Sequence, residues 1–229
     1  RQMCIRDRDR SIHQSLAASA SGKIVIGSMD SINQYLLRDI FRRIKVENPR
    51  MNIEFVSYHS QEIYSRLTAG YMDIGFAFNP IHYEIDALPV FREPLYMISI
   101  AGSAYPSGPI HPRDLDKQNQ VLFRWNPDIL AWNHEWWPES EAPYVQVDST
   151  ALLTTFLTDP LHWAVCPASV AGYLSSHGLV EIHQFEIATP QRICYLLKKR
   201  RPAGMHSESV DQFIDLFYRL LPTHPWRYE

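Results

Sequence analysis

Residues 22–78 read GKIVIGSMDSINQYLLRDIFRRIKVENPRMNIEFVSYHSQEIYSRLTAGYMDIGFAF. Three short apolar runs in this stretch, at residues 23–28, 53–56 and 74–78, are typical of buried parallel strands. Helical patterns fill both gaps between the runs. The stretch therefore predicts a strand–helix–strand–helix–strand unit of an α/β domain.

The two predicted helices have recognisable boundaries. In the first, residues 31–47, apolar Leu36, Ile40 and Ile44 recur every four residues with arginines on the opposite side. Ser31 and Ser60 are plausible N-caps of the two helices, whether or not they also touch a ligand. Gly70 ends the second helix, and Asp73 then opens the third strand in a structural hydrogen-bonding role.

Strands joined by helices of this length run parallel, with right-handed crossovers. Small molecules bind to such sheets beyond the carboxyl ends of the strands. These ends lie at residues 28–31, 58–60 and 78–80. The first half of the chain is thus expected to supply part of a small-molecule site.

The same stretch resembles the effector-binding domain of LysR-type transcriptional regulators. The matching motifs are Gly22-x-Ile24-x-Ile26-Gly27, Leu36-Leu37-x-x-Ile40-Phe41 followed by Asn48-Pro49, and Leu67-x-x-Gly70-x-x-Asp73-Ile74-Gly75-Phe76. The resemblance continues more weakly to about Leu221. One departure is the segment 158–167, which lacks the glycine-rich turn that the family commonly places before its late strand.

The chain after residue 78 reads as a second α/β unit with its own strands and helices. Together with the resemblance, this predicts an α/β, two-lobed periplasmic-binding-protein-like (type 2) fold, with a hinge of two chain crossings and an interdomain cleft. Lobe I would comprise residues 23–92 and 199–221, lobe II residues 93–198, and the tail residues 222–229. The apolar stripe at 210–221 predicts a C-terminal helix packed on lobe I.

The first residues need a separate interpretation. Residues 1–8 look like a translated sequencing adapter, which would make Cys4 non-native. Residues 9–22 would be the remnant of the linker helix that joins family members to a winged helix-turn-helix. By the resemblance, DNA would be bound only through that missing domain, and the protein would be a homodimer or homotetramer with residues 31–47 at the subunit interface.

Composition agrees with a cytoplasmic sensing domain. The 229 residues are 45% hydrophobic and carry a net charge of −3, which argues against nucleic-acid binding by this surface. No apolar run is long enough for a membrane span, and no membrane partner is expected. Cys166 and Cys194 lie in predicted strands and are expected to be buried free thiols.

Candidate effector contacts are the side chains at strand ends and helix starts, where N–H groups favour carboxylate or phosphate. They are Ser28, Met29, Ser31, His59, Ser60, Phe78, Arg124, Trp125, Ser149, Thr150 and Pro167. Arg124 would pair with a carboxylate, although a surface role is the alternative. Phe78, Trp125 and Pro167 would form apolar walls. The tryptophans at 125, 132, 136 and 137 are otherwise explained by core or dimer packing.

The predicted function is sensing of a small anionic or aromatic metabolite, without catalysis, cofactor or metal. The histidines form no metal-binding spacing, and the sequence has no P-loop, Gly-x-Gly-x-x-Gly or Gly-x-Ser-x-Gly motif. Two alternatives use the same scaffold: an extracytoplasmic solute-binding protein of a transporter, and an enzyme such as a dehydratase-like lyase. The sequence upstream of this chain would distinguish the first alternative from a regulator.

Overall fold

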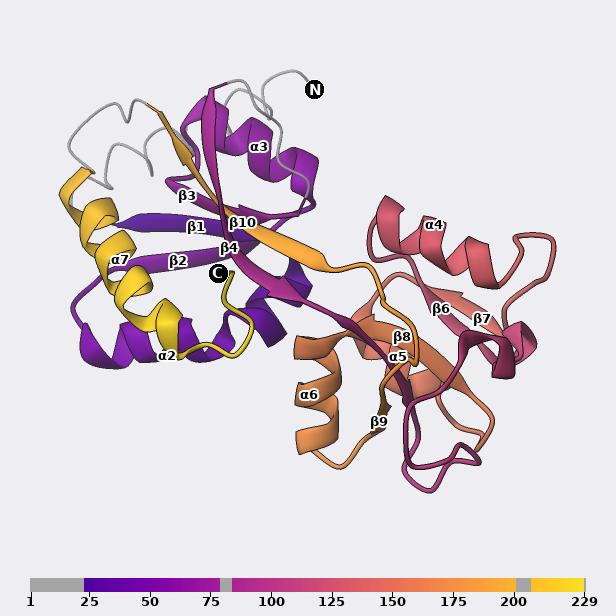
Figure 1. The fold of residues 1–229 in the computed structure, drawn as a ribbon. Coiled ribbons are helices and arrows are strands. Elements are labelled where there is room, and N and C mark those ends of the chain that lie inside the picture. Colours follow the sequence, from indigo (N-terminus) through magenta and orange to yellow (C-terminus); the bar gives the residue numbers. More distant parts are fainter. Residues whose placement is uncertain (1–22, 79–83, 201–206, 229) are drawn as a thin grey trace, which may run out of the picture. The chain divides into compact units, whose positions relative to one another are not determined.

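The computed structural model describes residues 23–78, 84–200 and 207–228, which form two compact units (Figure 1). The described parts of unit 1 are residues 23–33, 37–78, 84–90, 195–200 and 207–227. Those of unit 2 are residues 34–36, 91–194 and 228. The predicted adapter segment and linker remnant lie outside the described residues.

Unit 1 is built on a mixed five-stranded sheet. Its strands, in spatial order, are β2 (Ile53–Ser57), β1 (Ile24–Ser28), β3 (Ile74–Ala77), β10 (Arg192–Lys199) and β4 (Ile85–Glu93). Strand β1 pairs in parallel with both β2 and β3, whereas β10 runs antiparallel to β3. The predicted parallel unit is confirmed, and the carboxyl ends of β1 and β2 lie together at one edge.

Helices cover both faces of this sheet, because neighbouring residues of a strand point to opposite sides. Helix α3 (Ser60–Ala69) packs against one face, where Ile63 lies beside Gly75 and Leu67 joins a cluster with Ala77. Helices α2 (Arg38–Glu47) and α7 (Ser207–Leu220) meet on the other face. There Phe76 contacts Phe41 and Phe217, with ring centroids 5.9 and 5.3 Å away. The apolar stripe of the C-terminal helix thus packs on unit 1, as predicted.

Local geometry favours glycine at two positions of unit 1. A Cβ on Gly75 would lie 2.8 Å from Cγ2 of Ile63 and 3.3 Å from Cβ of Leu197. Gly70 ends α3 with φ +82°, in the left-handed region that favours glycine. Asp73 has the predicted structural role, because its Oδ2 accepts a 2.8 Å hydrogen bond from the Val25 N–H.

The first helix differs from its prediction. Residues 31–47 form a five-residue π-helical turn, η1 (Ile32–Leu36), followed by α2, instead of one continuous α-helix. Ser31 has helical backbone angles and makes no capping hydrogen bond, so its prediction as an N-cap is wrong. The prediction for Ser60 is also wrong in detail, because His59 occupies the N-cap of α3. A capping residue needs extended backbone angles, which Ser31 does not adopt.

Unit 2 contains a three-stranded antiparallel sheet and a parallel strand pair. The sheet has the order β8 (Trp163–Pro167), β5 (Leu95–Ser99), β9 (Glu181–His183), and the pair consists of β6 (Val121–Phe123) and β7 (Val145–Val147). A bridge between Gln120 and Trp163 connects the two. Strand β9 is absent from the sequence-based prediction, because three residues are too short to show periodicity.

Helices α5 (Thr150–Phe156) and α6 (Ala168–Ser176) pack on these strands, and α4 (Pro127–Trp136) contributes Ile129 and Trp132 to the same core. Asn126 caps α4, accepting a 2.8 Å hydrogen bond from the Ile129 N–H. Trp132 and Trp137 are buried and meet edge to face at 5.8 Å. Core packing therefore explains these two tryptophans.

Side-chain hydrogen bonds order the turn within residues 158–167, the segment that contains no glycine. His162 is buried, and its Nδ1 accepts hydrogen bonds from the N–H groups of Thr158 and Asp159. Tyr105 donates a 2.5 Å hydrogen bond to the Leu161 carbonyl. The His162 imidazole thus orders this turn.

Candidate functional site

In unit 1, polar side chains gather where β1 and β2 end. The buried Ser28 hydroxyl donates to Oδ1 of Asn33, and Nδ2 of Asn33 donates to Oγ of Ser57 at 3.0 Å. The Asn33 amide therefore links the two strand ends. Ser57 is exposed and keeps its own O–H available as a donor.

Two further predicted residues lie in the same region. Ser60 donates to the thioether sulfur of Met29 at 3.3 Å. A thioether is a weak acceptor, so an incoming oxygen would compete well for this O–H. The exposed His59 makes no side-chain cap at the start of α3, which leaves the helix N-terminus without the usual capping acceptor. Ser28, Met29, His59 and Ser60 are thus brought together at one edge, together with Asn33 and Ser57, which the prediction omitted.

The other two unit 1 candidates are buried. Phe78 follows β3 and is 3% exposed, and Ser31 is 8% exposed. Contact of these two residues with an effector stays a prediction.

In unit 2, Ser149 and Thr150 lie at the start of α5. Ser149 is the exposed N-cap, without a side-chain capping bond. The buried Thr150 accepts a 3.1 Å hydrogen bond at Oγ1 from the hydroxyl of Tyr35, whose ring packs edge to face on Tyr173. Tyr35 comes from the π-helical turn, an element often found at functional sites.

The remaining three candidates lie near β6 and β8. Arg124 follows β6 and is exposed. Trp125 is 7% exposed, and its indole N–H donates to the Val165 carbonyl at 2.7 Å. Pro167 is buried at the N-cap of α6. Arg124 is therefore accessible, whereas Trp125 and Pro167 belong to the interior of unit 2.

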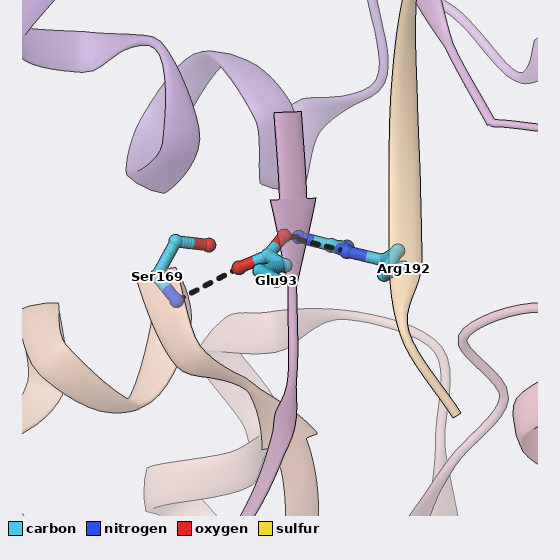
Figure 2. Close-up of polar contacts among 3 residues, drawn as sticks. All are labelled: Glu93, Ser169 and Arg192. Atoms are coloured by element: carbon cyan, nitrogen blue, oxygen red, sulfur yellow. Dashed lines mark hydrogen bonds and ion pairs between the residues drawn. The ribbon is translucent and has the colours of Figure 1, made fainter. Parts of the chain in front are cut away.

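Figure 2 shows a buried charge pair that the prediction missed. Oε1 of Glu93 accepts from Nε and Nη2 of Arg192 at 2.8 and 2.5 Å, and both side chains are at most 1% exposed. The other carboxylate oxygen, Oε2, accepts from the Ser169 N–H at the start of α6, also at 2.8 Å. The N-terminus of α6 is thus already occupied by a carboxylate of the chain itself. The sequence signal was an acidic residue at the end of one strand, separated by Pro94 from the apolar strand that follows.

The two cysteines are buried free thiols, as predicted. Burial raises the pKa of both thiols well above the ordinary value, and the nearby Glu93 carboxylate adds to the effect. A thiol with a raised pKa remains protonated and is a poor nucleophile. Cys166 and Cys194 are therefore suited to packing.

One buried cluster resembles a nucleophile–base pair. Oγ of Ser99 lies 3.0 Å from Nε2 of His183, but the two side chains are 0% and 4% exposed. Glu181 binds the Gly102 N–H and the Ser103 hydroxyl instead of the imidazole. The cluster joins β9 to the loop after β5. No metal-binding group of three His, Cys, Asp or Glu residues occurs in the described parts of the chain.

Comparisons with known structures place the fold. The reduced regulatory domain of OxyR from Pseudomonas aeruginosa has a TM-score of 0.69 at 17% identity, covering 88% of this chain and 97% of that one. A reduced form of OxyR from N. meningitidis gives 0.69 at 18%, covering 90% and 97%. The effector-binding domain of QuiR in complex with shikimate gives 0.67 at 13%, covering 89% and 98%. At these identities the likeness shows the two-lobed periplasmic-binding-protein-like fold alone.

Sequence comparison shows the family. The chain has no significant match among curated proteins. The model of the LysR substrate binding domain, however, matches residues 17–221, which is most of the chain. The chain therefore belongs to the LysR substrate-binding domain family, the ligand-sensing regulatory domains of LysR-type transcriptional regulators.

Proposed function

We propose that this domain senses a small metabolite with a carboxylate or similar oxygen-rich group, bound at the ends of β1 and β2. The observation that carries the proposal is the set of donors at this edge. Among the described residues, the Ser57 O–H has no acceptor and Ser60 donates only to a thioether, and α3 begins without a side-chain cap. Donors without good acceptors favour an anionic ligand.

The QuiR domain, described in complex with shikimate, offers a first probe for this chain. Shikimate and benzoate combine a carboxylate with a hydroxylated and an aromatic ring, respectively, and their methyl esters remove the charge. Calorimetric titration of the chain is expected to show binding of an acid and weaker binding of its ester. A broad acid panel that produces no binding and no thermal shift would remove the proposal.

Variants locate the bound acid. Ser57→Ala and Ser60→Ala each remove a donor, and a hydrogen bond to a charged group contributes about 1.5–3 kcal/mol, so affinity should fall about tenfold or more. Ser65→Ala is the matched control, because Ser65 is an exposed serine of the same helix whose hydroxyl bonds to the Glu62 carbonyl. Equal affinities in all three variants would place the ligand elsewhere.

We propose Arg124 separately, as a cationic contact of unit 2 for an anionic ligand. It is exposed, and no ion pair of Arg124 occurs among the described residues. Arg124→Ala is expected to weaken acid binding without changing thermal stability, whereas Arg113→Ala, another exposed arginine of unit 2, should have no effect. Unchanged affinity in Arg124→Ala would remove this residue from the site.

We further propose that ligand binding acts through a homodimer or homotetramer, with α2 at the subunit interface, and that DNA is bound by a separate segment of the full-length regulator. Val46 on α2 supports this, because its side chain is 74% exposed. A charge at this position should weaken self-association, so Val46→Lys is expected to shift the sedimentation coefficient towards the monomer. A parent chain that is monomeric at high concentration would contradict the proposal.

The proposed function excludes catalysis, and it favours a cytoplasmic regulator over a transporter component. In support of the first point, Ser99 and His183, a pair among the described residues that resembles a nucleophile and base, are buried away from solvent. The match to the LysR substrate binding domain supports the second point. No helix in the described ranges is long and apolar enough to cross a membrane. Turnover of any acid that binds would argue for an enzyme instead.

A further inference from the structure

A small cavity lies inside unit 2, between β6, β8 and α4. Its lining is largely apolar and includes Leu122, Trp125, Ile129 and Val165. Two amide side chains interrupt this lining: Gln120, at the entry to β6, and Asn133, on the inner face of α4. They are 0% and 3% exposed.

These two amides have polar atoms without partners. Nε2 and Oε1 of Gln120 and Oδ1 of Asn133 are buried and make no hydrogen bond within the described structure. A buried polar atom that has lost its hydrogen bonds to water and gained none in the protein destabilises the fold, so three such atoms in one cavity would be a large penalty for a domain of this size. The penalty disappears if a bound molecule supplies one acceptor and two donors.

The size of the cavity limits what that molecule can be. The centre of a water-sized sphere can move over about 10 Å³. By this measure a cavity needs roughly 10–15 Å³ to hold one water, and buried waters typically make about three hydrogen bonds. The space therefore suits one water and is too small for an organic ligand.

We propose that this cavity binds a single structural water molecule that joins Gln120 to Asn133. The water accepts from Nε2 of Gln120 and donates to Oε1 of the same amide, whose N–H and C=O point to the same side. Its second O–H bonds to Oδ1 of Asn133. The water thus ties the entry of β6 to α4, directly behind Trp125, and it is independent of the proposed effector function.

A high-resolution crystal structure of the chain tests the assignment directly. One density peak within hydrogen-bond distance of all three atoms is the expected result. An empty cavity, or density for a larger molecule, would overturn it.

A double-mutant cycle gives a second, independent test through stability. Gln120→Met and Asn133→Leu keep the side-chain size but remove the polar atoms. If the water is present, each single variant leaves the water and the remaining amide without a hydrogen-bond partner. The melting temperature of each single variant should then fall by roughly 2–4 °C or more. The double variant should lose less than the sum of the two single losses. If the cavity is dry, each substitution removes an unsatisfied group, and the two should raise the melting temperature additively. Additive stabilisation would therefore overturn the proposal.

Discussion

Two helix N-termini of this protein follow strand ends but differ in what they bind. At α6 in unit 2, Glu93 fills the N-terminus, and Arg192 neutralises the carboxylate in a fully buried site. At α3 in unit 1, the N-cap His59 contributes no acceptor, and the neighbouring Ser60 is partly accessible. The first helix end is closed by a carboxylate of the chain itself, whereas the second has no side-chain cap and is the end proposed above to bind an external anion.

The difference indicates that a helix N-terminus can hold either a structural carboxylate of the chain or a ligand. A helix N-terminus favours negative charge because its first N–H groups have no partners within the helix. When the chain supplies the charge, the result is a rigid junction between strands and helix. When it does not, the same groups are left for a ligand. The closed junction in unit 2 is thus an internal example of the carboxylate recognition proposed for unit 1.

The largest expected effect on stability comes from removing the Glu93 charge at the N-terminus of α6. Glu93→Gln removes the charge and leaves the Arg192 guanidinium buried without its counterion, which should cost about 3–5 kcal/mol of unfolding free energy in urea denaturation. Asp86→Asn is the matched control, because Asp86 pairs with Arg200 at 3.0 Å in an exposed position, where such pairs contribute about 0–1 kcal/mol.

The Asp86→Asn control tests whether the Glu93–Arg192 pair stabilises the fold more than an exposed ion pair does. Equal small losses in Glu93→Gln and Asp86→Asn would mean that the buried pair is not a structural junction, and the contrast between the two helix ends would fail. The double variant Glu93→Gln, Arg192→Met should recover part of the loss, since it removes the unpaired charge as well.

The next largest effect is expected from adding a capping side chain at the N-terminus of α3. His59→Asp places a carboxylate at the N-cap of α3, so the domain should gain about 1 kcal/mol while its affinity for the acid falls about tenfold through like-charge repulsion. His59→Asn caps the helix without charge and should give a similar gain in stability with a smaller loss of affinity. Measurements of melting temperature and titration calorimetry on both variants separate capping from charge. If His59→Asp bound the acid as tightly as the parent, α3 would not contact the anion.

The smallest expected effect is the pH dependence of stability that comes from the buried His183 of unit 2. Burial lowers the pKa of His183 below its ordinary value of 6.5, although the Pro106 carbonyl and Glu181 partly oppose the shift. The unfolded chain therefore takes up a proton before the folded chain does, so stability is full above about pH 6.5 and declines as the pH falls. The slope contributed by one histidine is at most about 1.4 kcal/mol per pH unit.

His183→Gln should flatten this decline between pH 6.5 and 5, a window in which unfolding free energies can be compared directly. Glu181 should not interfere there, because its pKa lies below the ordinary value of 4.5, chiefly through the hydrogen bond from the Gly102 N–H. If the unfolding free energy of the variant declined with pH as steeply as that of the parent, His183 would not be a buried, neutral group in solution.

Local patterns in the sequence were sufficient for most of unit 1. The order of strands and helices, the left-handed Gly70 and the structural Asp73 all follow from short-range signals: apolar spacing, glycine conformation and a carboxylate next to a strand. The apolar stripe of α7 likewise predicted its packing. The sequence signals for these features lie within a few residues, even where the partners, Val25 for Asp73 and α2 for α7, are distant along the chain.

Features that depend on distant partners were missed or misplaced. Ser31 was predicted as a cap because of its residue type, but the π-helical turn holds it in helical geometry. Asn33 and Ser57 are 24 residues apart and meet only because β1 and β2 pair in parallel. Trp125 looked like a ligand wall, yet its indole is bonded to a strand 40 residues later.

The sequence by itself determined the family, the two α/β units and the strand ends where polar side chains collect, because motif spacing and apolar periodicity are local. Only the tertiary structure decided which of those side chains are available. Glu93 and Arg192 are 99 residues apart, and their pairing closes one helix end. Ser60 and Met29 meet across 31 residues and leave the other end open. Burial and hydrogen-bond partners are properties of the packed chain, and they distinguish the structural carboxylate of unit 2 from the binding site proposed for unit 1.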